Sequence, residues 1–252
     1  MRKIYLVPAL VGLLTSVAIG PLAAQGAVPN QAPVPKQKAA PAPKASAAAA
    51  PVAAGATAAA AAETPAAEDK TKAIDGFRSA KFGMNETDVR AAMAKDFSPK
   101  PDAIKIQDNA SELTRSLLLS APELLPNGGT AELSYVFGYK SKSLIQVGAV
   151  WSKGTDAAMT PEKLFSNANI LRAHFMGEGF KPDSIAVNMP VSGGIVMFRG
   201  SDTKDRSVIL LLQGTFENKE NNQRVLTPTS LLLFYVADAK SPDIFKLPPG
   251  QF

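Results

Sequence analysis

The strongest constraint on how this chain folds is a change in composition near residue 73. Residues 25–72 are rich in Ala, Pro and Lys and contain no large aliphatic or aromatic residue. Such a segment cannot build a core, and its prolines interrupt the Ala runs that could otherwise form helix. We therefore expect a disordered Ala/Pro-rich spacer over residues 25–72 and a folded domain over residues 73–252. At about 3.1 Å per residue, the extended spacer would reach on the order of 150 Å.

The first 24 residues have the pattern of a secretory signal peptide. Arg2 and Lys3 precede an apolar stretch from Ile4 to Ala24, which ends in small residues. A basic start, an apolar stretch and a small-residue exit are typical of signal peptides, with cleavage expected after Ala24. The alternative is an uncleaved membrane anchor, because the apolar stretch is close to the ~20 residues that span a bilayer. Either way, we expect the domain to be exported to the periplasm or secreted.

Charge and cysteine content exclude several classes of protein. The whole chain carries a formal charge of +5, but residues 73–252 contain 20 basic and 19 acidic residues. Without a basic surface the domain is not expected to bind nucleic acid. The chain has no Cys, so it has no disulfide, no thiolate metal site and no residue to carry a lipid.

Two segments carry the signals of a helix start. Asn85 and Thr160 are good N-caps, and each lies between a Met and an apolar residue that can form a hydrophobic staple. The staple pairs are Met84 with Val89 and Met159 with Leu164. These signals predict helices over residues 86–96 and 161–176.

Each predicted helix is followed by strand-like segments. Expected strands cover residues 114–121, 131–139, 143–151, 185–189, 195–199, 208–216 and 231–236. The order predicts an α+β fold in which antiparallel meanders carry two helices on one face. Its recurrence about 75 residues apart suggests a tandem α-β3-4 duplication with halves 73–153 and 154–252. The alternative is that two generic helix caps happen to match.

One short motif resembles a known family. The run Phe82-Gly83-Met84, followed by Val89 at the start of a helix, resembles small secreted envelope modules of the SmpA/OmlA lipoprotein and β-lactamase-inhibitor-protein type. The likeness covers about fifteen residues. It implies a non-enzymatic module that binds proteins or stabilises envelope assemblies. The chain departs from the lipoprotein pattern because it lacks the lipidated Cys.

The residues that could perform chemistry are few. His174 is the single histidine, and its position on the second helix favours a surface or partly buried side chain. Glu123 and Glu132 are the candidate carboxylates for an enzyme or carrier acting on envelope glycans or lipids. Asp202 and Asp205 could hold a weak calcium ion, but a solvated turn is the preferred interpretation. No catalytic residue, metal or cofactor is assigned.

The candidate binding surface consists of four aromatic residues that alternate along adjoining strands. These are Tyr135, Phe137, Tyr139 and Trp151. Aromatic side chains are common anchors at protein interfaces. The alternative is that the same stripe faces the covering helix and belongs to the core.

These observations favour a periplasmic, non-enzymatic module on a flexible tether that binds an envelope or periplasmic protein. One alternative is an enzyme or carrier acting on envelope glycans or lipids. The other is a membrane-anchored tether that spans the periplasm, which requires an uncleaved N-terminal segment.

Overall fold

The computed structural model describes residues 72–218, 224–247 and 250. The predicted signal peptide and residues 25–71 of the predicted spacer lie outside the described residues. Within the described residues, no helix is both long enough and apolar enough to cross a bilayer.

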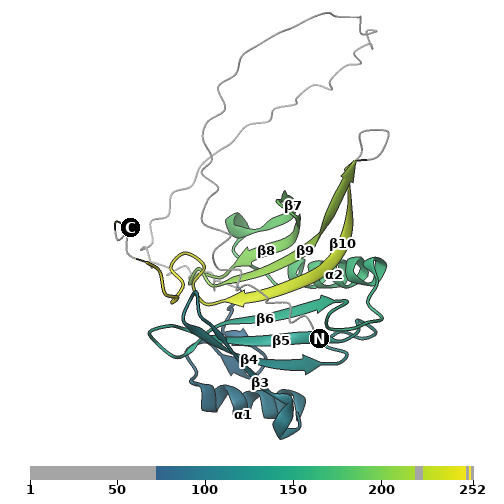
Figure 1. Cartoon of the computed structure of the whole chain (residues 1–252). Coiled ribbons are helices and arrows are strands. Elements are labelled where there is room, and N and C mark those ends of the chain that lie inside the picture. The colour runs from purple at the N-terminus through teal and green to yellow at the C-terminus, as the bar shows by residue number, and fades with distance from the viewer. Residues whose placement is uncertain (1–71, 219–223, 248–249, 251–252) are drawn as a thin grey trace, which may run out of the picture. The chain divides into compact units, whose positions relative to one another are not determined.

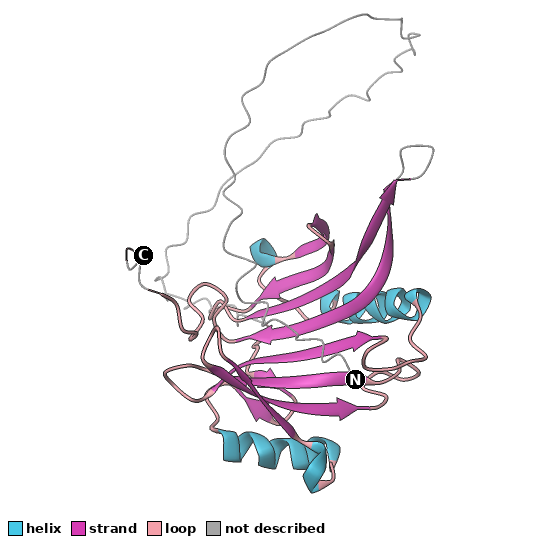
Figure 2. Ribbon diagram, in the orientation of Figure 1, coloured by secondary structure: helices cyan, strands magenta, loops and turns pink. Residues whose placement is uncertain are grey.

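The described chain forms an α+β fold with two α-helices and ten strands (Figures 1 and 2). The helices are α1 (Glu86–Phe97) and α2 (Pro161–Met176). A small hairpin, β1 (Gly76–Phe77) and β2 (Ala80–Lys81), precedes α1. The strands of the main sheet are β3 (Lys105–Asn109), β4 (Thr114–Ala121), β5 (Ala131–Phe137), β6 (Leu144–Ser152), β7 (Ala186–Val191), β8 (Gly194–Ser201), β9 (Ser207–Asn218) and β10 (Arg224–Val236).

Both helices begin where their capping residues predict. The Asn85 side chain accepts a hydrogen bond from the Asp88 N–H, and the Thr160 side chain accepts one from the Lys163 N–H. Each bond satisfies one of the four N–H groups that a helix start leaves unpaired. The expected helix starts are therefore confirmed. The bounds of the elements also confirm the expected end of the second helix and the central residues of most expected strands.

The eight main strands form one antiparallel sheet in the order β3-β4-β5-β6-β10-β9-β8-β7 (Figure 1). Two four-stranded meanders, β3–β6 and β7–β10, meet along the central pair β6 and β10. Each meander follows one helix and one short 3₁₀ turn, Pro101–Ala103 or Pro182–Ser184. The chain thus contains two successive units of the same element order.

A short sequence repeat occurs at the same position in each unit. Lys100-Pro101-Asp102-Ala103-Ile104 and Lys181-Pro182-Asp183-Ser184-Ile185 both form the 3₁₀ turn that leads from the helix into the first strand. Proline suits the first position of such a turn because its φ is already fixed near the helical value.

Three strand regions were missed: the hairpin β1–β2, strand β3 and the first half of β10, residues 224–230. The hairpin β1–β2 has only two residues in each strand. Strand β3 is an edge strand with the sequence Lys-Ile-Gln-Asp-Asn and no buried residue, so it lacks the apolar alternation that identifies a half-buried strand.

The main hydrophobic core lies between the helices and one face of the sheet, the covered face. Buried residues of both helices, such as Met93 and Phe175, belong to the same cluster as Leu133, Leu210 and Leu233 from the strands. Phe175 of α2 stacks on Phe198 of β8 with ring centroids 5.5 Å apart. Apolar burial of this kind is the main stabilising term of the fold.

The opposite face of the sheet, the outer face, carries a second and smaller hydrophobic cluster. Among the described residues this cluster consists of strand residues and Ala239, and neither α1 nor α2 contributes to it. Since directly paired residues in antiparallel strands point to the same face, the strand register fixes which residues belong to the outer face. The interior strands β9 and β10 are therefore apolar on both faces, as their sequences predict.

Candidate functional site

The predicted aromatic surface lies mostly in the core. The exposed fractions are 0% for Tyr135, 3% for Phe137 and 0% for Trp151, and all three belong to the covered-face cluster. Tyr139 is partly exposed and packs edge-on against Phe245, with ring centroids 5.5 Å apart. Alternation correctly placed Tyr135, Phe137 and Trp151 on one face, but that face is the one covered by the helices.

Two of these aromatic side chains leave a polar atom unpaired in the core. The Tyr135 hydroxyl and the Trp151 Nε1 are buried and have no hydrogen-bond partner. Burial, assisted by the nearby Asp96 carboxylate, raises the pKa of Tyr135 strongly, so its hydroxyl stays neutral at physiological pH. The buried positions of Tyr135 and Trp151 fit a structural role in the core.

The other side chains that could act in catalysis or bind a metal lie in different parts of the structure. His174 lies on α2 with 58% of its side chain exposed, which confirms the expected surface position. Glu123 is exposed in the β4–β5 connection, whereas Glu132 is half-buried on the outer face of β5. The glycine-containing segments Ser192-Gly193-Gly194 and Asn127-Gly128-Gly129 lie at connections between neighbouring strands. No cluster of three or more potential metal ligands exists among the described residues.

The expectation of a solvated turn at Asp202 is wrong. Asp202 is 1% exposed and accepts hydrogen bonds from the N–H groups of Ile74, Lys204 and Arg206 and from the Arg206 Nε. Although burial opposes ionisation, these hydrogen bonds hold the pKa of Asp202 below its usual value. The carboxylate joins the β8–β9 turn to the segment that precedes β1. Asp205 is exposed instead and pairs with Lys240 at 2.6 Å.

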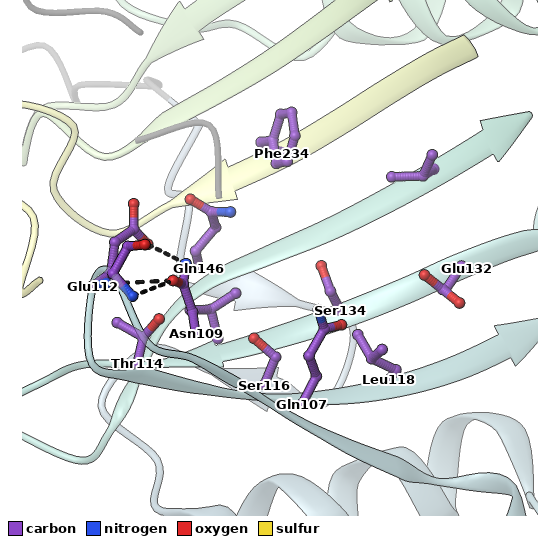
Figure 3. A pocket seen from close by; sticks show the side chains of 13 residues that line it. Gln107, Asn109, Glu112, Thr114, Ser116, Leu118, Glu132, Ser134, Gln146 and Phe234 are labelled. Atoms are coloured by element: carbon purple, nitrogen blue, oxygen red, sulfur yellow. Dashed lines mark hydrogen bonds between the residues drawn. The ribbon is translucent and has the colours of Figure 1, made fainter. Parts of the chain in front are cut away.

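The outer face is hollowed at its β3–β6 end by a groove of about 180 Å³ (Figure 3). Polar side chains from β3, β4, β5 and β6 line it, and Phe234 of β10 closes one side. The lining residues are Gln107, Asn109, Ser111, Glu112, Thr114, Ser116, Leu118, Glu132, Ser134, Val136, Gln146, Val150 and Phe234.

The β3–β4 turn supplies one end of the groove and is held in place from two sides. Asn109 Oδ1 accepts hydrogen bonds from the N–H groups of Ser111 and Glu112, and Asn109 Nδ2 donates to Glu112 Oε2 at 3.1 Å (Figure 3). The Phe245 N–H, from the segment after β10, donates to the Glu112 carbonyl at 2.9 Å. Partial burial raises the pKa of the Glu112 carboxyl.

Two buried polar side chains lie deeper in the groove. Thr114 is 3% exposed, and its hydroxyl has no hydrogen-bond partner. Gln146 is also 3% exposed and contributes its amide to the lining. A buried hydroxyl without a partner carries a desolvation cost, and most buried polar groups in native proteins are paired.

The glutamates of the groove do not form a catalytic carboxylate pair. Glu112 and Glu132 lie at opposite ends of the groove in Figure 3. Glu132 lies opposite Ser120 on β4, whereas Glu112 precedes Thr114 at the other end of that strand. At about 3.3 Å per residue, Thr114 and Ser120 are roughly 20 Å apart, and acid/base pairs for glycoside hydrolysis are about 5 to 9.5 Å apart.

Across the rest of the outer face, the residues change from apolar to polar. One row of directly paired residues runs from β7 to β4 in the order Met189, Val196, Leu211, Leu232, Val150, Glu132, Ser120. Its members are apolar from β7 to β6 and polar on β5 and β4. We call this set the outer row. The apolar members from β8 to β6 belong to the second hydrophobic cluster.

The sequence singled out Glu132 as a candidate carboxylate but did not indicate the groove. Asn109 and Glu112 depend on strand β3, which was missed, and Gln146 lies within a strand selected for its apolar residues. The polar residues Thr114, Ser116 and Ser120 all lie on the face of β4 that faces away from its buried apolar residues. This pattern in the sequence could have indicated a polar outer face.

Comparison of the chain with protein-family models, curated proteins and solved structures found no match.

Proposed function

We propose that this protein is an exported, non-enzymatic module that binds an envelope protein through the outer face of its sheet. The observation that supports the proposal is the outer row. It combines a continuous apolar stretch from β7 to β6 with polar residues on β5 and β4, and both helices pack on the other face.

The composition of this row suits a protein partner. Interfaces combine an apolar centre with a polar rim, and they bury about 800 Å² on each side in stable complexes. Arg199, in the row next to the outer row, pairs across the strands with Ile209, and its buried Nε has no hydrogen-bond partner. The four apolar members from β8 to β6 are only 4% to 9% exposed, so the apolar member that a partner can contact is Met189, which is 40% exposed at the β7 end. A partner that packs on Met189 and contacts the polar end of the row would use both features.

The N-terminal sequence supports the proposal that the module acts outside the cytoplasm. Arg2, Lys3 and the apolar stretch from Ile4 to Ala24 direct export, and residues 25–72 would give the bound domain a long reach. The resemblance of the Phe82-Gly83-Met84 region to envelope modules points in the same direction.

The test is chemical cross-linking in intact cells with tagged full-length protein, followed by mass spectrometry. One dominant envelope protein is expected with the wild type and with an Ile170→Lys control, because Ile170 is exposed on α2. Met189→Lys and Ser120→Arg, which change exposed positions at the two ends of the outer row, should reduce its recovery at least tenfold. Recovery of the protein alone, or loss of the partner only with Ile170→Lys, would refute the proposal.

A further inference from the structure

The groove on the outer face has a lining that selects strongly among ligand chemistries. Its thirteen lining residues include three amides, four hydroxyls and two carboxylates, and none of them is Lys or Arg. Anionic groups such as phosphates or sulfates would meet Glu112 and Glu132 without a cation to pair with, so the lining disfavours them.

The volume of the groove sets the size of the ligand. A cavity of about 180 Å³ is smaller than the 300 to 1,000 Å³ of sites for drug-sized molecules. It has room for one ring or one short side chain, and a longer ligand would have to extend beyond it.

The arrangement of polar and apolar groups points to a ligand with a polar edge and an apolar face. Phe234, Val150 and Val136 supply apolar surface, while the amides of Gln107 and Gln146 can both donate and accept hydrogen bonds. Gly148 lies between Phe234 and Ser134 in the paired strands, and a Cβ at this position would lie 2.7 Å from the Ser134 hydroxyl. The glycine therefore keeps the floor of the sheet open beside the Phe234 ring.

The buried hydroxyl of Thr114 is the observation that indicates a bound ligand. It lines the groove, it is 3% exposed, and it has no hydrogen-bond partner among the described residues. A ligand hydroxyl could either donate to it or accept from it, which would compensate the desolvation of this group.

We propose that this groove binds a single neutral saccharide ring of a glycan, with its hydroxyls on Thr114, Gln146 and Asn109 and its C–H face toward Phe234. This site shares Val150 and Glu132 with the outer row, but saccharide binding does not depend on the protein-binding role proposed for that row. A sugar hydroxyl donates and accepts at once, as the amides and the Thr114 hydroxyl require. An ammonium group can only donate, so it would use the glutamates and would not accept from the amide N–H groups of Gln107 and Gln146.

The experiment uses the full-length protein on an array of neutral hexose, neutral N-acetylhexosamine and uronic-acid oligomers, followed by calorimetry with each oligomer that binds. Binding to a neutral oligomer and not to the uronic-acid series is expected. Failure of every neutral oligomer to bind at millimolar concentration would overturn the proposal, as would binding of the uronic-acid series alone.

The decisive variant is Thr114→Val, which keeps the shape of the side chain and removes the unpaired hydroxyl. Affinity should fall about three- to tenfold while the thermal midpoint stays the same or rises. Thr215→Val is the matched control, because Thr215 is exposed on β9 outside the groove, and its affinity should equal that of the wild type. Equal affinities for Thr114→Val and Thr215→Val would overturn the assignment.

A second pair of variants separates a saccharide from a cationic ligand. Glu112→Gln and Glu132→Gln keep the size and the acceptor oxygen while removing the charge. Affinity for the neutral oligomer should remain within about threefold and should depend little on salt. Loss of binding in both variants, together with a strong salt dependence, would show that the groove recognises a cation and would overturn the saccharide assignment.

Discussion

The two faces of the main sheet are built from the same strands but differ in what their side chains contact. On the covered face, apolar and aromatic residues extend from β4 to β9 and pack against both helices. On the outer face, the residues from β7 to β6 are mostly apolar, whereas on β5, β4 and β3 polar residues predominate beside Val136 and Leu118. Packing against the helices explains why the covered face is apolar. It does not explain the polar residues on the β3–β5 side of the outer face. The proposed binding of a ligand and a partner would explain them.

The largest effect that would test this comparison is expected from Trp151→Ala. Trp151 is 0% exposed on the covered face, so its truncation should cost about 3 to 5 kcal/mol in the free energy of unfolding. Phe165→Ala is the matched control, because Phe165 is 51% exposed on α2, and it should cost less than about 1 kcal/mol. Urea denaturation of both variants measures the difference. A Trp151→Ala protein as stable as the control would place Trp151 outside the core.

A smaller but still large effect is expected from Asp202→Asn, because Asp202 holds the segment before β1 to the β8–β9 turn. The substitution puts an amide where the carboxylate accepts from the Ile74 N–H and the Arg206 Nε. We expect a loss of about 3 kcal/mol at pH 7, measured by urea denaturation. A change below 1 kcal/mol would contradict the structural role.

The pH dependence of that loss provides an independent check. Because the pKa of Asp202 is lowered in the folded protein, its stabilisation is fully present above its unfolded pKa of about 3.9. It disappears as the pH falls through the lower folded pKa. The stability difference between wild type and Asp202→Asn should therefore be constant above about pH 5 and shrink below about pH 4. A difference that grows in acid would refute this assignment.

Thr114→Val should have a modest effect of opposite sign on the free protein. Removing a buried hydroxyl that lacks a partner should raise the free energy of unfolding by about 1 kcal/mol in the absence of ligand. Calorimetric melting of the wild type and the variant measures it. Destabilisation by more than 1 kcal/mol would mean that the hydroxyl is paired within the protein.

The smallest effect is expected from His174→Ala. The imidazole is largely exposed at the end of α2, 3.4 Å from Glu178, so its loss should change stability by less than about 0.5 kcal/mol. It should also leave recovery of the cross-linked partner unchanged, because α2 lies on the covered face. Loss of the partner in this variant would move the interaction surface from the outer face to α2.

Local signals in the sequence predicted much of the fold. Caps at Asn85 and Thr160 set the helix starts, because a side-chain acceptor at that position satisfies N–H groups that nothing else pairs. Alternating apolar residues identified β5 and β6. In β5 one side is buried more than the other, whereas β6 is buried on both sides. Strand β3 escaped detection since it lies at the edge of the sheet and buries no side chain.

The candidate site was much less predictable. Alternation grouped Tyr135 with Phe137, but it could not tell which face the helices would cover, since that depends on how α1 and α2 dock. The groove brings together residues from Gln107 to Phe234, and it depends on the pairing of β6 with β10 far along the chain. Only the tertiary structure reveals that Thr114 lacks a hydrogen-bond partner.

The most direct test of the central claim, that the outer face binds the partner, is photo-cross-linking in cells from single positions. A photoreactive residue at Met189 or Ser120 samples the outer row, and the same residue at Ile170 samples the outside of α2. The account predicts one common envelope protein cross-linked from Met189 and Ser120 and none from Ile170. Cross-links from Ile170 alone, or none above background from any position, would contradict it.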